Sequence, residues 1–155
     1  MKEMARYGVV LGLICVVASG LLAGVNAMTK DRIIAQAMAE EQASLKEVLP
    51  EASHFEPVKS GEETLYYKAL AKDGSLVGVA FKASGKGYSS IIETVVGMKS
   101  DGTINAIKVL SHNETPGLGN RIAEPSFTGQ FADKSAALEG VQAITGATIS
   151  SKAVM

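Results

Sequence analysis

The sequence has few of the residues on which several common classes of protein depend. One cysteine, Cys15, occurs among the 155 residues, which excludes an intramolecular disulfide framework and a cysteine-rich metal site. Two histidines, His54 and His112, occur without a cluster of further ligand residues, so no metal site is predicted. The net charge is only −1, which argues against nucleic acid as the main partner. The length suits one small domain.

The longest uncharged stretch lies near the start of the chain. Residues 9–28 read VVLGLICVVASGLLAGVNAM, twenty residues without a charge, and as a helix they would span about 30 Å. A cleaved signal peptide is the alternative, because Val25-Asn26-Ala27 resembles a small-residue cleavage site. The run is longer than the roughly 7–15 apolar residues of such a peptide. We therefore favour an uncleaved membrane anchor over residues 1–28.

The charges that flank this run give its orientation. Lys2 and Arg6 precede it, and Lys30 and Arg32 follow it, so the positive-inside signal is weak. We expect the short N-terminus inside and the long remainder outside. The chain is thus predicted to be a single-pass protein of the cell (inner) membrane, with its soluble part on the outer or periplasmic side.

A connecting helix is predicted over residues 29–50, and we expect it to continue from the anchor and to dock on the domain. Thr29 or Asp31 is a suitable cap for its start, apolar residues then recur at helical spacing, and Pro50 ends the pattern. The predicted organisation is an anchor over 1–28, this helix over 29–50 and a single domain over 51–155.

Two hairpins are predicted in the first half of that domain. Each places Asp-Gly between two apolar runs, and Asp-Gly is a strong hairpin signal, because both central turn residues need positive φ. The runs are Leu65–Ala71 with Leu76–Lys82, and Ile91–Met98 with Thr103–Leu110. The mixed pattern of the last run indicates a strand covered on both sides. We predict an α+β fold: an N-terminal transmembrane helix, then a small domain with a mainly antiparallel sheet and flanking helices.

Three glycine-containing loops are candidates for chemistry. They are SGKGYSS at 84–90, SHNETPGLG at 111–119 and ITGATISSKAV at 144–154. The first lacks the P-loop pattern, and taken alone it more often forms an ordinary inter-strand loop. In the second, Pro116 and two glycines shape a loop that presents Glu114, Thr115 and Leu118. The third places four hydroxyls before a helix-like tail, which suits a phosphate or, alternatively, an ordinary Ser/Thr helix cap.

Two of these motifs together carry a resemblance to a known family. H-x-E-T-P-G-L-G at 112–119, followed by T-G-A-T-x-S-S at 145–151, resembles the FMN-binding domain family. Within it the chain is most similar to the G subunit of the Rnf ion-translocating electron-transport complex. The related C subunit of the sodium-pumping NADH:quinone oxidoreductase is similar but longer. The resemblance covers nearly the whole chain.

The resemblance implies FMN attached covalently to Thr148 through a phosphoester. The family uses a separate Mg-dependent flavin transferase, which moves FMN from FAD onto the threonine. The remaining residues implied to bind the cofactor are Thr145, Gly146, Ala147, Ser150, Ser151, Glu114, Thr115, Leu118, Gly119, Gly87 and Tyr88. No catalytic residue is predicted, because the sequence offers no set of nucleophile, base and orienting group.

The implied function is that of a membrane-anchored electron carrier in an ion-translocating ferredoxin:NAD oxidoreductase. Its implied partners are polytopic membrane subunits, iron–sulfur subunits and flavin subunits, and it has no independent turnover. Gln142 stands where the family has Asp. A module that binds FMN non-covalently, or a scaffold or sensor without flavin, is therefore the alternative. The chain ends seven residues after Thr148, so we expect a C-terminal helix that is cut short.

Overall fold

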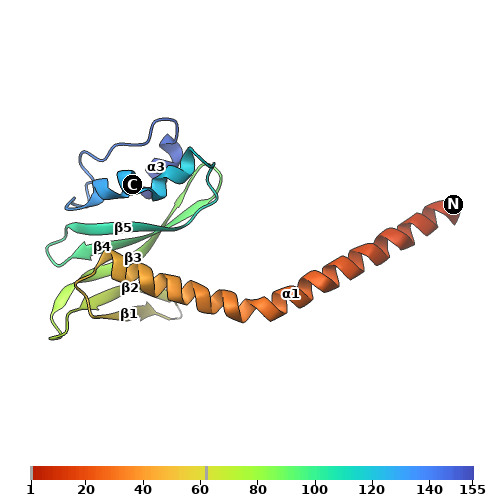
Figure 1. The fold of residues 1–155 in the computed structure, drawn as a ribbon, viewed down its shortest axis with the longest axis horizontal. Coiled ribbons are helices and arrows are strands. Elements are labelled where there is room, and N and C mark those ends of the chain that lie inside the picture. Colours follow the sequence, from red (N-terminus) through yellow and green to blue (C-terminus); the bar gives the residue numbers. More distant parts are fainter. Residues whose placement is uncertain (1, 62) are drawn as a thin grey trace. The chain divides into compact units, whose positions relative to one another are not determined.

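A computed structural model of the chain describes residues 2–61 and 63–155. The chain divides into two compact units. The first ends at Glu40, and the second runs from Glu41 to Met155. The first helix, α1 (Lys2–Val48), contributes to both units and is coloured red to orange in Figure 1. The three-part division predicted from the sequence remains a prediction.

The first unit consists of helix α1 up to Glu40. By length and composition α1 can cross a membrane, and the side chains of its most apolar stretch are exposed. The helix continues from the apolar run, as expected, but Thr29 and Asp31 lie inside it, so the prediction that one of them caps its start is wrong. Thr29 lies inside the helix, where its hydroxyl donates to the carbonyl of Val25 at 2.9 Å. Nothing between Thr29 and Pro50 breaks a helix that is already formed.

In the second unit, the last two turns of α1 pack on a sheet. Leu45 and Val48 are fully buried there, together with Leu49 just beyond the helix end. Polar contacts add to this packing. Glu41 pairs with Lys82 at 2.8 Å and accepts a hydrogen bond from the Tyr67 hydroxyl at 2.6 Å.

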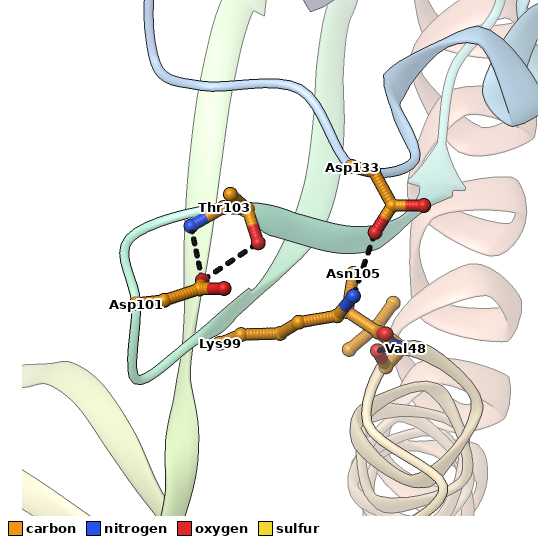
Figure 2. Close-up of polar contacts among 6 residues, drawn as sticks. All are labelled: Val48, Lys99, Asp101, Thr103, Asn105 and Asp133. Atoms are coloured by element: carbon orange, nitrogen blue, oxygen red, sulfur yellow. Dashed lines mark hydrogen bonds and ion pairs between the residues drawn. The ribbon is translucent and has the colours of Figure 1, made fainter.

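The helix end itself is held by a side chain of the sheet. Asn105 donates from its amide nitrogen to the Val48 carbonyl at 2.7 Å, as Figure 2 shows. This bond satisfies one of the carbonyls that the end of a helix leaves without a partner.

Five strands form an antiparallel meander in the order β1-β2-β3-β4-β5. They are β1 (His54–Ser60), β2 (Glu63–Leu70), β3 (Leu76–Lys86), β4 (Ile91–Lys99) and β5 (Ile104–Ser111). The last four agree with the two predicted hairpins. Strand β1 was not predicted, because it contains Pro57 and charged residues, a composition that only an edge strand tolerates.

The two Asp-Gly turns are built alike, but not as predicted. Only the glycines, Gly74 with φ 82° and Gly102 with φ 85°, have positive φ, whereas the aspartates do not. Each aspartate instead accepts two hydrogen bonds from the residue two positions on. Asp101 binds the amide and hydroxyl of Thr103 at 2.8 and 2.7 Å (Figure 2). An Asx-type turn thus replaces the turn with two left-handed residues.

The far face of the sheet is covered by short helices and irregular segments. They are η1 (Gly119–Ala123), α2 (Pro125–Thr128), η2 (Gly129–Phe131) and α3 (Thr148–Val154). Ile122, Phe127 and Phe131 form a core against the sheet, and the two phenyl rings meet edge to face with centroids 5.4 Å apart. An ion pair between Lys99 and Asp133 at 2.7 Å ties this layer to β4 (Figure 2). The predicted α+β class and the covering of β5 on both sides are confirmed.

Candidate functional site

A cavity of about 590 Å³ lies among three segments of the second unit that are far apart in the sequence. The first segment follows β3, the second follows β5, and the third enters helix α3. The lining residues are Tyr88, Glu114, Thr115, Leu118, Gly119, Gly146, Ala147, Thr148, Ile149 and Ser150. Nine of these ten are among the twelve site residues predicted from the sequence.

Three predicted residues lie outside this lining, and one lining residue was not predicted. Gly87 sits behind Glu114, where an added Cβ would come within 2.5 Å of the carboxylate. Thr145 and Ser151 flank the lining without joining it. Ile149 lines the cavity with half of its surface exposed. No chemical signal in the sequence distinguishes Ile149 from an ordinary apolar residue.

The loop after β3 is shorter than the sequence indicates. Strand β3 continues to Lys86, which pairs with Ile91 across the hairpin, so only residues 87–90 form the turn. Residues 84–91 line a separate hollow of about 410 Å³. Gly85 lies against helix α3, and a Cβ there would come within 1.9 Å of the Ala153 carbonyl oxygen. The glycine is therefore needed for packing of α3 against β3.

Glu114 is the most constrained side chain of the cavity wall. It is only 5% exposed. One of its oxygens accepts hydrogen bonds from the amides of Ser89 and Ser90 at 3.0 and 3.1 Å. The other accepts from the Ser150 hydroxyl at 2.6 Å and from the Tyr88 amide at 3.3 Å. A single carboxylate thus joins the three segments that form the cavity.

These hydrogen bonds determine the charge state of Glu114. Burial raises the pKa of a carboxyl, but the bonds from Ser150 and from the three amides lower it. The bonds outweigh burial, and the pKa of Glu114 lies below its ordinary value of 4.5. The side chain is therefore a carboxylate at neutral pH.

The four hydroxyls of the TGAT segment have two different roles. Ser150 donates to Glu114, and the buried Ser151 donates to the Ala147 carbonyl at 2.9 Å while it accepts the Ile144 amide. Among the described residues, Thr145 and Thr148 have no hydrogen-bond partner for their hydroxyls, and both residues are exposed.

The interpretation of this segment as a Ser/Thr helix cap is wrong. Helix α3 begins at Thr148 with Ala147 as its N-cap, and no side chain caps it. Gly146, with φ 83°, supplies the left-handed residue that turns the chain into the helix. Thr148, a residue of the cavity lining, therefore does not use its hydroxyl to cap the helix.

The chemistry of this lining fits a flavin nucleotide. The volume lies in the range of about 300–1,000 Å³ that is typical of small-molecule sites, and the wall is mainly apolar, as a planar ring requires. Thr148 and Ser150 both line the cavity, and the Ser150 hydroxyl donates to Glu114. Within residues 2–61 and 63–155, no group of three or more His, Cys, Asp and Glu side chains is placed to hold a metal ion.

Comparison with known proteins shows the class of protein to which the chain belongs. The sequence model of the FMN-binding domain matches residues 87–155, which contain the whole cavity lining. The sequence model of the RnfG N-terminal region matches residues 1–48, a range that ends with helix α1. The chain thus combines an N-terminal apolar helix with an FMN-binding domain.

The particular family follows from whole-length relatives. The G subunit of the ion-translocating oxidoreductase complex of Methanosarcina acetivorans is 37% identical, over 99% of this chain and 90% of that protein. The G subunit of the proton-translocating ferredoxin:NAD(+) oxidoreductase complex of Clostridium ljungdahlii is 33% identical, over 93% and 82%. Its Na(+)-translocating counterpart from Acetobacterium woodii is 32% identical, over 99% and 87%. The chain belongs to the family of G subunits of ion-translocating (Rnf) oxidoreductase complexes.

A solved structure supports the fold. The crystal structure of Shewanella oneidensis NqrC superposes with a TM-score of 0.52 at 23% identity, over 69% of this chain and 64% of that one. At this identity the likeness concerns the fold alone.

Proposed function

We propose that this chain is a membrane-anchored electron carrier with FMN attached covalently to Thr148 through a phosphoester. It works within an ion-translocating ferredoxin:NAD oxidoreductase, as the names of its relatives describe for them. The observation that carries the proposal is that Thr148 lines the cavity within the FMN-binding domain, and that its hydroxyl has no hydrogen-bond partner among the described residues.

The competing hydroxyls support the choice of Thr148. Ser150 and Ser151 are buried and their hydroxyls are engaged in hydrogen bonds. Thr145 has a free hydroxyl but lies outside the cavity lining. Of these four residues, Thr148 combines a free hydroxyl with a place in the wall.

The protein surroundings do not activate this hydroxyl. No hydrogen bond joins Thr148 to a base in the described residues, and the Glu114 carboxylate is occupied by Ser150 and three amides. An unaided hydroxyl is a weak nucleophile, so attachment depends on a separate flavin transferase. The hydroxyl oxygen bonds to the FMN phosphorus of FAD, the anhydride bond breaks, and AMP leaves as the hydroxyl proton is released.

Residues of this chain would then hold the attached FMN. The amides of Ile149 and Ser150 lie in the first turn of α3, where no intrahelical acceptor exists, and they suit an anionic phosphoester. The side chains of Tyr88, Leu118 and Ile149 are exposed at the cavity and would cover an aromatic ring. When bound, FMN supplies the electron transfer, and the protein supplies attachment and surroundings.

The membrane helix anchors the carrier but offers no path for ions. The stretch 9–28 contains no ionisable side chain other than Cys15, and ion paths in membranes need polar or ionisable groups. Ion movement therefore belongs to polytopic partner subunits, and iron–sulfur and flavin subunits exchange electrons with this one. We place the domain on the outer side of the cell membrane, where covalent attachment prevents loss of the cofactor.

Intact-mass measurement tests the attachment. The full chain is expressed with and without a flavin transferase, denatured, and weighed. We expect a transferase-dependent gain of one FMN less one water in the wild type and in Thr145→Ala, and no gain in Thr148→Ala. Covalent flavin retained in Thr148→Ala would contradict the site.

Gln142 favours one second candidate, a carrier that holds FMN without a covalent bond. The backbone of Gln142 is fixed by Gln130, whose side-chain oxygen accepts the Gln142 amide at 2.9 Å. Gln142 occupies the position at which the family resemblance implies an Asp. A transferase that requires the Asp carboxylate at this position would not attach FMN to this chain. Release of all flavin on acid precipitation would support this candidate.

A further inference from the structure

Glu114 connects the parts of the site more directly than any other residue of the cavity wall. It projects from the loop after β5 and binds the turn after β3 through three amides and helix α3 through the Ser150 hydroxyl. A second bond joins the same two loops, since the Asn113 amide donates to the Ser90 hydroxyl at 2.7 Å. The carboxylate therefore fixes the segment that carries Thr148 relative to both other walls.

The charge of this carboxylate has no cationic partner. None of the ion pairs in the described part of the chain, residues 2–61 and 63–155, involves Glu114. A buried charge without an opposite charge is costly, and here only hydrogen-bond donors stabilise it. Gln would fill the same space, yet would leave its NH₂ group facing the amide of Tyr88 or of Ser89, where a donor meets a donor. The donor set therefore selects a carboxylate.

We infer that Glu114 is a positioning residue of the flavin site that also keeps a fixed negative charge in the cavity wall, and that this charge lowers the reduction potential of the bound flavin. The inference rests on the proposed function, because it takes the cavity as the place where FMN binds. A negative charge on a buried side chain such as Glu114 opposes the arrival of electrons nearby. The hydrogen bonds hold that charge in one place instead of allowing it to turn toward solvent.

A purely structural role for Glu114 makes a different prediction. Loss of rigidity alone would affect any variant that removes a hydrogen bond to this carboxylate, whatever its charge. Glu114→Gln removes the charge and keeps the size of the side chain. Ser150→Ala keeps the charge and removes the shortest hydrogen bond to it. The two variants loosen the same contact, but only the first removes the negative charge.

The experiment uses the full chain, loaded with FMN by a flavin transferase, and measures the midpoint potential of the flavin by spectroelectrochemistry. We expect a more positive potential in Glu114→Gln and a potential that is unchanged or more negative in Ser150→Ala. An unaltered potential in flavin-loaded Glu114→Gln, or a shift of the same sign in both variants, would overturn the electrostatic role.

Hydrogen exchange of the chain without flavin tests the positioning role independently. In Glu114→Ala we expect the amides of Ser89 and Ser90 to exchange at least about tenfold faster, because each loses its acceptor. Unchanged exchange at both amides would overturn the role. If the wild type takes up no flavin, the proposed function fails and the electrostatic role with it, whereas the exchange experiment still decides whether Glu114 positions the three segments.

Discussion

The two faces of the sheet are covered by different kinds of structure. The regular end of α1 covers one face with Leu45, Val48 and Leu49. Short helices and loops cover the other face, and they enclose the cavity. On the helix face, the hollow beside Leu49 and Asn105 measures only about 170 Å³, against about 590 Å³ for the cavity of the other face. The irregular layer leaves a hollow, and its backbone bends supply free amides and an unbonded hydroxyl. One face thus packs against the end of the N-terminal helix, and the other carries the cavity that we propose as the flavin site.

The largest losses of stability should come from substitutions in the two hydrophobic cores, one on each face of the sheet. Their effects on flavin loading should differ. Phe127→Ala is expected to cost about 3–5 kcal/mol of stability, and Leu45→Ala about 2–5 kcal/mol, since both side chains are almost completely buried. Flavin loading should fall in Phe127→Ala, because its core supports η1, which begins at Gly119 in the cavity wall. Loading should persist in folded Leu45→Ala. Denaturant unfolding and flavin absorbance of the full chain measure both quantities; equal loss of flavin in both variants would break the division.

The next effect concerns two glycines with different surroundings. A Cβ on Gly119 would lie 2.9 Å from Glu114 Cβ and 3.1 Å from the Ser150 hydroxyl oxygen, whereas a Cβ on Gly74 would meet nothing within 4 Å. Gly119→Ala should therefore cost about 1–3 kcal/mol by overpacking and reduce flavin loading. Gly74→Ala should cost about 1–2 kcal/mol through its positive φ and leave loading intact. Reduced loading in Gly74→Ala would contradict the assignment of the site to the far face.

A smaller effect is expected from pH at Glu114, on the far face. The folded-state pKa of Glu114 is lowered from 4.5, so its contribution to stability is complete above that value and is lost as the pH falls through the lowered pKa. Between about pH 5 and about pH 3, the wild type should lose more stability than Glu114→Gln. Parallel pH profiles of the unfolding free energy would show that the Glu114 hydrogen bonds do not stabilise the domain.

The smallest effect should come from the helix face. Tyr67→Phe removes the hydrogen bond to Glu41 but leaves the Lys82 pair in place, so about 1 kcal/mol is expected. Burial and Glu41 raise the pKa of Tyr67 to about 12, so its phenolate should form later in a titration than those of exposed tyrosines. Thermal unfolding and phenolate absorbance measure the two effects. Flavin loading should not change.

Regular parts of the molecule were predictable from local pattern. The apolar run 9–28 and the two Asp-Gly hairpins follow from composition and periodicity. In the structure the run is part of helix α1, and the hairpins are strands β2 to β5. The geometry of the turns was not predictable from local pattern, because Asp101 accepts hydrogen bonds from Thr103 and thereby stabilises a different turn. Strand β1 depends on pairing with β2, which no local pattern of its own sequence signals.

The sequence named most residues that line the candidate site, but it did not predict the contacts between them. The motifs named most of the lining, yet they did not distinguish the free Thr148 hydroxyl from the bonded Ser150 and Ser151 hydroxyls. That distinction arises from long-range contacts, above all from Glu114, which lies 36 residues before Ser150. Sequence spacing carries no information on which of several hydroxyls a distant carboxylate will bind.

The most direct test of the account is the mass of the Thr148 peptide after co-expression of the full chain with a flavin transferase. The account predicts a gain of one FMN less one water on that peptide, dependent on the transferase and absent in Thr148→Ala. An unmodified Thr148 peptide, or the same gain on a peptide that contains another hydroxyl, would contradict it.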